Sequence, residues 1–469
     1  MEINRQEEQG QMTGRTGRPS EEATSASTPA VSRISRRDFL KISGAGLAGA
    51  ALLGVAGCGG GGGGGSAVGI TFATTPDPTG TFQALIDEFN SQNSGQIEVT
   101  YREMPPDSSQ YLDQLRTEFQ GGSTNISVFE ADVTWPAQFA LPGFVLDLSD
   151  RFTEEEQQGF LEAPLQTNVY EGGIFGVPWR TDAGFLYYRR DLLEQAGISA
   201  PPATWDEVKQ QASTVQQQSG TRYGYVFQGA DYEGGVVNAL EYINSAGGNV
   251  LDPNDSSVVT VDSPEAREGL TTERSMVEDG ITPQAVSTYK EDESTAAFLN
   301  GDAVFLRNWP YVYAQAGDSA VSSITQDQVG IAPLPASSGG ESVSGLGGWN
   351  LMINALADPE VQDASYELIR FMTAPEQQRR LATEGSYLPI LQELYDDQEV
   401  QDAVPVVALG AEAIQNTVPR PVSPFYSDMS LVMAEQFNAS LNGEEDPETV
   451  TSTLQQELTD IIEQGQGLA

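Results

Sequence analysis

The stretch GVPWRTDAGFLYYRRDLLEQAG occupies residues 176–197 and anchors the interpretation of the chain. An apolar run leads into a polar turn at residues 180–182, and an aromatic, strand-like run follows. A short helix then ends at Gly197, because glycine readily takes the left-handed conformation that closes a helix. Trp179, Arg180 and Asp182 combine a flat ring with hydrogen-bonding groups, which suits a polar, ring-shaped ligand.

The composition indicates an acidic, soluble protein with two domains. The 469 residues are 39% hydrophobic and 19% charged, enough for two cores. The formal net charge of -44 argues against nucleic acid as a partner, since phosphate binding needs Lys and Arg. It favours neutral or cationic ligands, although most of the acidity is expected to be solvated surface.

Two residue types are nearly absent, and their absence excludes whole classes of chemistry. The chain has no His, which rules out Ser-His-Asp and Cys-His catalysis and His-ligated zinc. Its single Cys rules out an internal disulfide and a cysteine-cluster metal site. A calcium site at Asp252, Asn254 and Asp255 is the one metal alternative, and a plain turn explains those residues better. We predict no metal and no cofactor.

The first 67 residues have the pattern of an export signal followed by a tether. After a polar tail, SRRDFLK at residues 35–41 resembles a twin-arginine signal through Arg36 and Arg37. The small-residue run that ends at Cys58 resembles a bacterial lipobox, which implies cleavage after residue 57 and lipid on the Cys58 sulfur. We therefore expect residues 1–57 to be a disordered tail plus signal peptide, and the Gly-rich residues 58–67 to be a lipid-anchored tether on the outer face of the membrane.

Strand and helix patterns alternate from residue 68, which predicts an α/β fold with a parallel sheet. A strand over residues 126–129 runs into Asp132 and Trp135. Ligands in open α/β sheets lie beyond the carboxyl ends of strands, so both side chains are candidates for ligand contact. The alternative for Asp132 is a helix N-cap for the turn that follows.

Similar polar and aromatic groups follow the strands of the second half. A strand over residues 303–306 is followed by Trp309 and Tyr311, beside a proline that favours a surface turn over core packing. Further along, the sequence GGW at residues 347–349 opens another strand. Trp309 and Tyr311 are therefore also expected at the ligand edge.

Taken in order, these segments resemble the extracellular solute-binding proteins of bacterial ABC importers, in particular the sugar-binding group that includes maltose- and trehalose/maltose-binding proteins. The resemblance covers residues 68–465 and rests on the joint order of several short segments rather than on any one of them. The segments are the lipobox Cys58, DVTWPAQFA from Asp132, GVPWRTDAGFLYYRRDLL from Gly176, TWDEV from Thr204, FLNGDAVFLRNWPY from Phe298, GGWNLMIN from Gly347 and the helix end FMTAPEQQR.

The resemblance implies a periplasmic-binding-protein fold: two α/β lobes joined by hinge crossings, with a ligand cleft between them. It places lobe one at residues 68–181 and 346–390, and lobe two at residues 182–345 and 391–469. Together with the residue chemistry, it gives a ligand-binding set of Asp132, Trp135, Arg180, Asp182, Trp309, Tyr311, Gly347, Gly348, Trp349 and Arg420. Relatives often carry an aromatic residue at the position of Arg180, so Arg180 is where ligand preference is expected to differ.

We therefore predict a monomeric, non-enzymatic lipoprotein that captures a di- or oligosaccharide and delivers it to a membrane permease. An α-linked disaccharide such as trehalose or maltose is the best single candidate. Carboxylates accept hydrogen bonds from sugar hydroxyls, and aromatic rings cover the apolar sugar face. One alternative is a glycoside hydrolase that uses Asp132 and Asp182 as its carboxylate pair. The other is a binding protein for a non-sugar, cationic solute.

Overall fold

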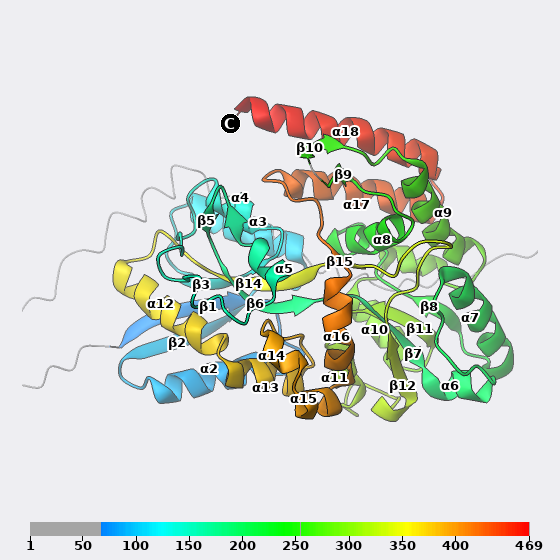
Figure 1. Cartoon of the computed structure of the whole chain (residues 1–469), viewed down its shortest axis with the longest axis horizontal. Helices are drawn as coiled ribbons and strands as arrows, with labels where there is room; N and C mark the ends of the chain where they lie inside the picture. The colour runs from blue at the N-terminus through cyan, green and yellow to red at the C-terminus, as the bar shows by residue number, and fades with distance from the viewer. Residues whose placement is uncertain (1–66, 254, 469) are drawn as a thin grey trace, which may run out of the picture. The chain divides into compact units, whose positions relative to one another are not determined.

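Two separate β-sheets, each with its own helices, organise the fold (Figure 1). The structure is a computed structural model, and it describes residues 67–253 and 255–468. The strand order is β2-β1-β3-β14-β6 in the first sheet and β12-β7-β11-β8 in the second. The predicted α/β class is confirmed.

The first sheet is mixed rather than parallel. Its strands are β1 (Val68–Thr74), β2 (Ile97–Glu103), β3 (Val128–Asp132), β6 (Val177–Asp182) and β14 (Gly347–Ile353). Strands β2, β1 and β3 run parallel as predicted, but β14 is antiparallel to both β3 and β6. The prediction of a parallel sheet was therefore wrong for this part, because β14 returns from the second sheet and enters from the opposite direction.

Helices cover the first sheet with the faces that the sequence pattern predicts. Helix α2 buries Phe82, Leu85, Ile86 and Phe89, which recur at helical spacing. Helices α2 and α12 pack against β2 and β1 respectively. The helices and short strands of this part are α2 (Thr81–Gln92), α3 (Ser108–Gln120), α4 (Pro136–Ala140), α5 (Glu162–Gln166), β4 (Val169–Tyr170), β5 (Gly173–Ile174), α12 (Pro359–Met372) and α13 (Pro375–Gly385).

The second sheet holds β7 (Phe185–Arg189), β8 (Tyr223–Val226), β11 (Ala303–Asn308) and β12 (Val329–Ala332). Strand β11 extends two residues beyond the predicted end, so Arg307 and Asn308 are part of it and pair with Leu186 and Phe185 of β7. The other elements are α6 (Arg190–Gln195), α7 (Trp205–Ser219), α8 (Glu233–Ser245), β9 (Leu251–Asp252), β10 (Asp255–Val259), α9 (Pro264–Glu278), η1 (Gln284–Thr288), α10 (Glu291–Leu299), α11 (Val312–Ala316) and η2 (Gln326–Gln328).

The C-terminal part is helical and adds to the second sheet's side of the fold. Its elements are β13 (Ser344–Gly345), α14 (Gln392–Tyr395), α15 (Gln398–Ala403), α16 (Pro405–Gln415), β15 (Thr417–Val418), α17 (Tyr426–Asn442) and α18 (Pro447–Leu468). Helices α17 and α18 lie side by side and share one apolar core with α8 and α9 (Figure 1). Across the described residues, no helix is both long and apolar enough to cross a membrane. The lobe boundaries given above remain a proposal.

The connections between the two sheets bring the ends of strands from both sheets close together. Strand β6 ends at Asp182 and β7 begins at Phe185, so only two residues link the first sheet to the second. Phe185 pairs with Asn308, the last residue of β11. A second connection ends in β13, whose Gly345 pairs with Val418 of β15 just before β14 begins. The ends of β3, β6 and β11 therefore lie close to the same connections, which is where the candidate site forms.

Candidate functional site

One row of paired residues crosses the end of the first sheet. Trp349 of β14 pairs with Asp132 of β3 on one side and with Arg180 of β6 on the other. Gly347 pairs with Asp182 in the same sheet. Three separate segments of sequence thus place two carboxylates, a guanidinium and an indole ring at one sheet edge. The rule on strand ends predicted this place for Asp132, whereas Trp349 reaches it because β14 runs antiparallel to β3.

Glycine is required where β14 enters this row. Gly348 has a φ of 123°, a conformation that side-chain-bearing residues rarely adopt. A methyl group on Gly347 would lie 2.9 Å from Cζ3 of Trp309 and 3.0 Å from Cβ of Asp182. Gly347 therefore lets a ring from the second sheet approach a carboxylate of the first.

Arg180 is buried between two carboxylates and three rings. Its Nη1 donates to Asp182 at 3.1 Å, and its Nη2 donates to Glu130 at 3.4 Å. Its guanidinium carbon lies 5.1 to 5.8 Å from the ring centroids of Tyr387, Trp349 and Phe82. Burial lowers the pKa of Arg180, but the charges of Glu130 and Asp182 outweigh it and raise that pKa above the ordinary value.

Asp182 keeps one carboxylate oxygen without a partner. Its Oδ2 accepts from Arg180, whereas its Oδ1 is buried and has no hydrogen-bond partner. Burial raises the pKa of Asp182 to about 6, with Arg180 opposing the rise and the charges of Glu130 and Asp132 adding to it. A buried, unpaired acceptor is costly, so this oxygen marks a place where a hydroxyl or amine donor would bind.

Asp132 is held by both its own turn and a distant arginine. Its Oδ1 accepts hydrogen bonds from the backbone nitrogen and the hydroxyl of Thr134, at 2.9 and 2.8 Å. Nη2 of Arg420 donates to both carboxylate oxygens, at 2.8 and 3.0 Å. The predicted N-cap alternative is wrong in detail: Asp132 caps the turn before α4, while Trp135 occupies the position that precedes the helix.

The guanidinium of Arg420 lies between two carboxylates, so both of its Nη atoms already have partners within the protein. Besides Asp132, it donates through Nη1 to Glu233 of α8 at 2.5 Å. Burial lowers the pKa of Arg420, but the two carboxylates outweigh it and raise the pKa. Its Nε is buried without a partner. Arg420 therefore joins β3 of the first sheet to α8 beside the second.

Trp309 and Tyr311 follow β11 and complete the row from the second sheet. Both side chains are partly exposed. The hydroxyl of Tyr187 is buried and donates to the backbone oxygens of Trp309 and Pro310 at 2.8 and 3.1 Å, which holds this turn in place. Trp309 also lies over the guanidinium of Arg307, with 4.1 Å between its ring centroid and the guanidinium carbon.

Trp135 lies behind the row. It is 3% exposed and packs edge-on against Trp349 and Tyr111, at ring-centroid distances of 5.7 and 5.3 Å. Its position supports the Trp349 ring from inside the core and leaves little of Trp135 for direct contact.

Sequence reasoning did not identify four charged residues and one tyrosine in this neighbourhood. Glu130 and Arg307 lie within apolar strands, and a charged residue in an apolar strand is a sequence signal that could have identified them as functional candidates. Glu233 and Glu241 lie on a helix, and Tyr387 follows another; nothing in their local sequence indicates the site. The set is Glu130, Glu233, Glu241, Arg307 and Tyr387.

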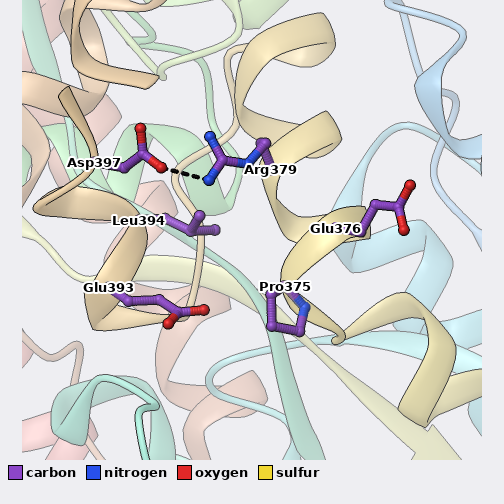
Figure 2. Close-up of a pocket in the computed structure, with 6 residues that line it drawn as sticks. All are labelled: Pro375, Glu376, Arg379, Glu393, Leu394 and Asp397. Carbon is purple, nitrogen blue, oxygen red and sulfur yellow. Dashed lines mark hydrogen bonds and ion pairs between the residues drawn. The ribbon is translucent and has the colours of Figure 1, made fainter. Parts of the chain in front are cut away.

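A pocket elsewhere is separate from these residues. Figure 2 shows it between α13 and the α14–α15 segment, with Arg379 paired to Asp397 and the carboxylates of Glu376 and Glu393 at the surface.

The described residues contain no group of three His, Cys, Asp or Glu able to hold a metal ion. Asn254, and likewise Cys58, Arg36 and Arg37, lie outside the described residues.

Comparison with known families identifies two segments. A family model described as bacterial extracellular solute-binding protein matches residues 73–379. A second model, for the twin-arginine translocation signal, matches residues 33–54, which confirms the predicted export signal.

Individual relatives agree with the family model. A probable ABC transporter-binding protein of Deinococcus radiodurans is 34% identical over 371 residues, covering 77% of this chain and 86% of the relative. Among solved structures, maltose-bound MalE3 of T. maritima is 36% identical with a TM-score of 0.80, covering 84% of this chain and all of that one. The GacH receptor of Streptomyces glaucescens, solved with and without acarbose, has a TM-score of 0.75 at 23% identity, covers 85% of this chain and 99% of its own, and shows the fold alone.

Proposed function

The chain belongs to the bacterial extracellular solute-binding proteins, and from that premise we propose that it captures a neutral di- or oligosaccharide for an ABC importer. The family consists of binding proteins rather than enzymes, which confirms the non-enzymatic prediction. The glycoside-hydrolase alternative on Asp132 and Asp182 is therefore set aside.

The observation that carries the sugar proposal is the unpaired, buried Oδ1 of Asp182. Trp309 approaches Asp182 across Gly347, and Arg180, the partner of Asp182, lies over the Trp349 ring. A sugar hydroxyl would donate to this oxygen, and the rings of Trp309 and Trp349 would cover apolar sugar faces. The unpaired Nε atoms of Arg180 and Arg420 would donate to further sugar oxygens. Arg180 and Arg420 already give Asp182 and Asp132 a guanidinium partner within the protein, so neither carboxylate needs a cationic ligand as its counter-ion, and a neutral ligand fits.

The remaining predicted residues divide between contact and support. Tyr311 would add a ring face and a hydroxyl, and Gly347 and Gly348 would let the sugar approach the backbone of β14. Trp135 would act from behind, through Trp349. Maltose is the first ligand to test, because the solved relative with 36% identity holds maltose.

We also propose that the protein is retained at the membrane. The twin-arginine signal exports it, and lipid on Cys58 would then hold it on the outer face of the cell membrane. Residues 58–67 would be the tether between the lipid and the folded part, which delivers its sugar to the permease. Replacing Cys58 by Ala should move the exported protein from the membrane fraction to the soluble fraction. Retention of the Cys58→Ala protein in the membrane would overturn the anchor.

A thermal-shift screen tests the ligand class. A ligand that binds only the folded protein stabilises it by about 2.7 kcal/mol when its concentration is a hundred times its Kd, and this stabilisation raises the melting temperature. We expect maltose, trehalose or a maltooligosaccharide to give a shift, and spermidine to give none. A shift from spermidine alone, or release of monosaccharide during incubation, would contradict the proposal.

A pair of variants locates the response. Trp349→Ala should remove the sugar shift while the protein stays folded. Phe371→Ala is the matched control, because Phe371 is likewise a partly exposed ring that packs edge-on against a buried ring, Phe89, away from the row. An unchanged sugar response in Trp349→Ala would remove Trp349 from the site.

A further inference from the structure

A buried ion pair lies next to the proposed sugar contacts without being one of them. The side chains of Arg307 in β11 and Glu241 in α8 are 1% and 2% exposed. Nε of Arg307 donates to Glu241 Oε2 at 2.8 Å, Nη2 donates to the other carboxylate oxygen, and Nη1 donates to Gln228 at 3.2 Å. Buried ion pairs add little net stability, because desolvation offsets their attraction. The pair is therefore more informative as a device that fixes geometry.

The arginine covers one face of the Trp309 ring. Its guanidinium carbon is 4.1 Å from the ring centroid, within the range of a strong cation–π contact. The edge of the Trp309 ring lies against Gly347, and this contact limits how far the ring can turn. With one face covered and one edge blocked, the partly exposed Trp309 presents its other face as the platform for a sugar.

The glutamate ties this platform to both connections between the sheets. Glu241 Oε1 accepts a hydrogen bond from the backbone nitrogen of Gly345 at 3.1 Å and one from the Ser344 hydroxyl at 3.3 Å. The backbone nitrogen of Gly184, between β6 and β7, donates to that same hydroxyl. A methyl group on Gly184 would lie 2.7 Å from both Arg307 Nη2 and Glu241 Oε1, so the pair closes only because residue 184 is glycine.

We propose that Glu241 and Arg307 are positioning residues for sugar binding, which hold the Trp309 ring flat against the guanidinium and fix it relative to β14. The inference rests on the proposed function, since it concerns the same site. Arg307 packs against one face of the Trp309 ring. Glu241 joins Arg307 to Gly345, two residues before Gly347. Loss of the pair frees the Trp309 ring, and part of the binding free energy is then spent on ordering the ring, which lowers the affinity for sugar.

A double-mutant cycle with Trp309 distinguishes positioning from general stability. The paired change Glu241→Gln/Arg307→Met removes both charges and leaves no carboxylate or guanidinium alone in the core. With Trp309 present, we expect it to raise the Kd for maltose about tenfold, the size of one partly desolvated cation–π contact. In the Trp309→Ala background, where no ring remains to be positioned, the same change should raise Kd by less than about twofold.

The matched control is Arg189→Met/Asp191→Asn. Arg189 lies in the same sheet and pairs with Asp191 at 2.7 and 2.8 Å, but it has no ring contact among the described residues. Its loss should lower the melting temperature and leave the maltose Kd unchanged.

Arg307→Lys serves if the paired change fails to fold. Lysine keeps a charge opposite Glu241 but cannot lie flat on the ring, so we expect a rise in Kd of about threefold that also disappears in the Trp309→Ala background. An equal rise in both backgrounds, or an unchanged Kd with Trp309 present, would overturn the inference. Failure of the unaltered protein to bind any sugar would instead count against the proposed function, before any variant is compared.

Discussion

Replacing Asp182 by Asn should make the protein more stable at neutral pH while weakening its binding of sugar. Burial raises the pKa of Asp182 from an ordinary 3.8 to about 6. Because the folded protein holds this proton more tightly than the unfolded chain, the contribution of Asp182 to stability is fully present below pH 3.8 and is lost as pH rises through about 6. Two pKa units correspond to about 3 kcal/mol.

Asparagine resembles the protonated acid and carries no charge at any pH. The Asp182→Asn protein should therefore match the original near pH 4 and exceed it by about 3 kcal/mol at pH 8. Its Kd for maltose should rise about tenfold, because a neutral amide oxygen is a weaker acceptor for a sugar hydroxyl than a carboxylate.

Chemical denaturation across pH 4 to 8 and calorimetric titration with maltose measure the two effects. Asp302→Asn is a suitable control, since Asp302 lies in the turn before β11, away from the site. An Asp182→Asn protein that is less stable at pH 8, or whose advantage does not grow with pH, would refute the reasoning from burial. A Kd equal to that of the original protein would remove Asp182 from the ligand contacts.

Three further outcomes follow from the same structure. Arg420→Met removes the guanidinium partner of the buried Asp132 and the partly buried Glu233, and should lower the free energy of unfolding by about 3 to 5 kcal/mol, measured by chemical denaturation. A loss below about 1 kcal/mol would contradict the network. Burial raises the pKa of Glu273 from 4.5 to about 8, so Glu273→Gln should gain stability over the original protein as pH rises from 4.5 through about 8, and a constant difference in melting temperature across that window would count against it. Gly347→Ala puts a methyl group against the Trp309 ring and should weaken maltose binding at least as much as loss of the ring's ion pair; normal affinity by calorimetric titration would show that the ring moves freely.

Local patterns predicted the elements that form the site's frame. The helix with Phe82, Leu85, Ile86 and Phe89 follows from spacing alone. The strand predicted over residues 126–129 is present, but it lies at Val128–Asp132 and includes Asp132 itself. The placement of Asp132 at the ligand edge follows from the rule on strand ends, whereas the Gly347–Trp349 segment reaches the same edge only because β14 runs antiparallel to β3.

The partners of these residues were beyond local reasoning. A charge inside an apolar strand, such as Glu130 or Arg307, shows its purpose only when its counter-ion from a distant segment is known. Arg420 was predicted as a ligand contact, but its two carboxylate partners lie 187 and 288 residues away in the sequence. The antiparallel direction of β14 likewise depends on a connection from the other sheet, which spacing within the strand does not encode.

A crystal structure of the protein with bound maltose tests the central claim most directly. The account predicts the sugar between the rings of Trp309 and Trp349, with one hydroxyl donating to Oδ1 of Asp182 and Arg307 still flat against the far face of Trp309. Maltose bound away from both rings, or an Asp182 Oδ1 that the sugar leaves without a partner, would contradict it.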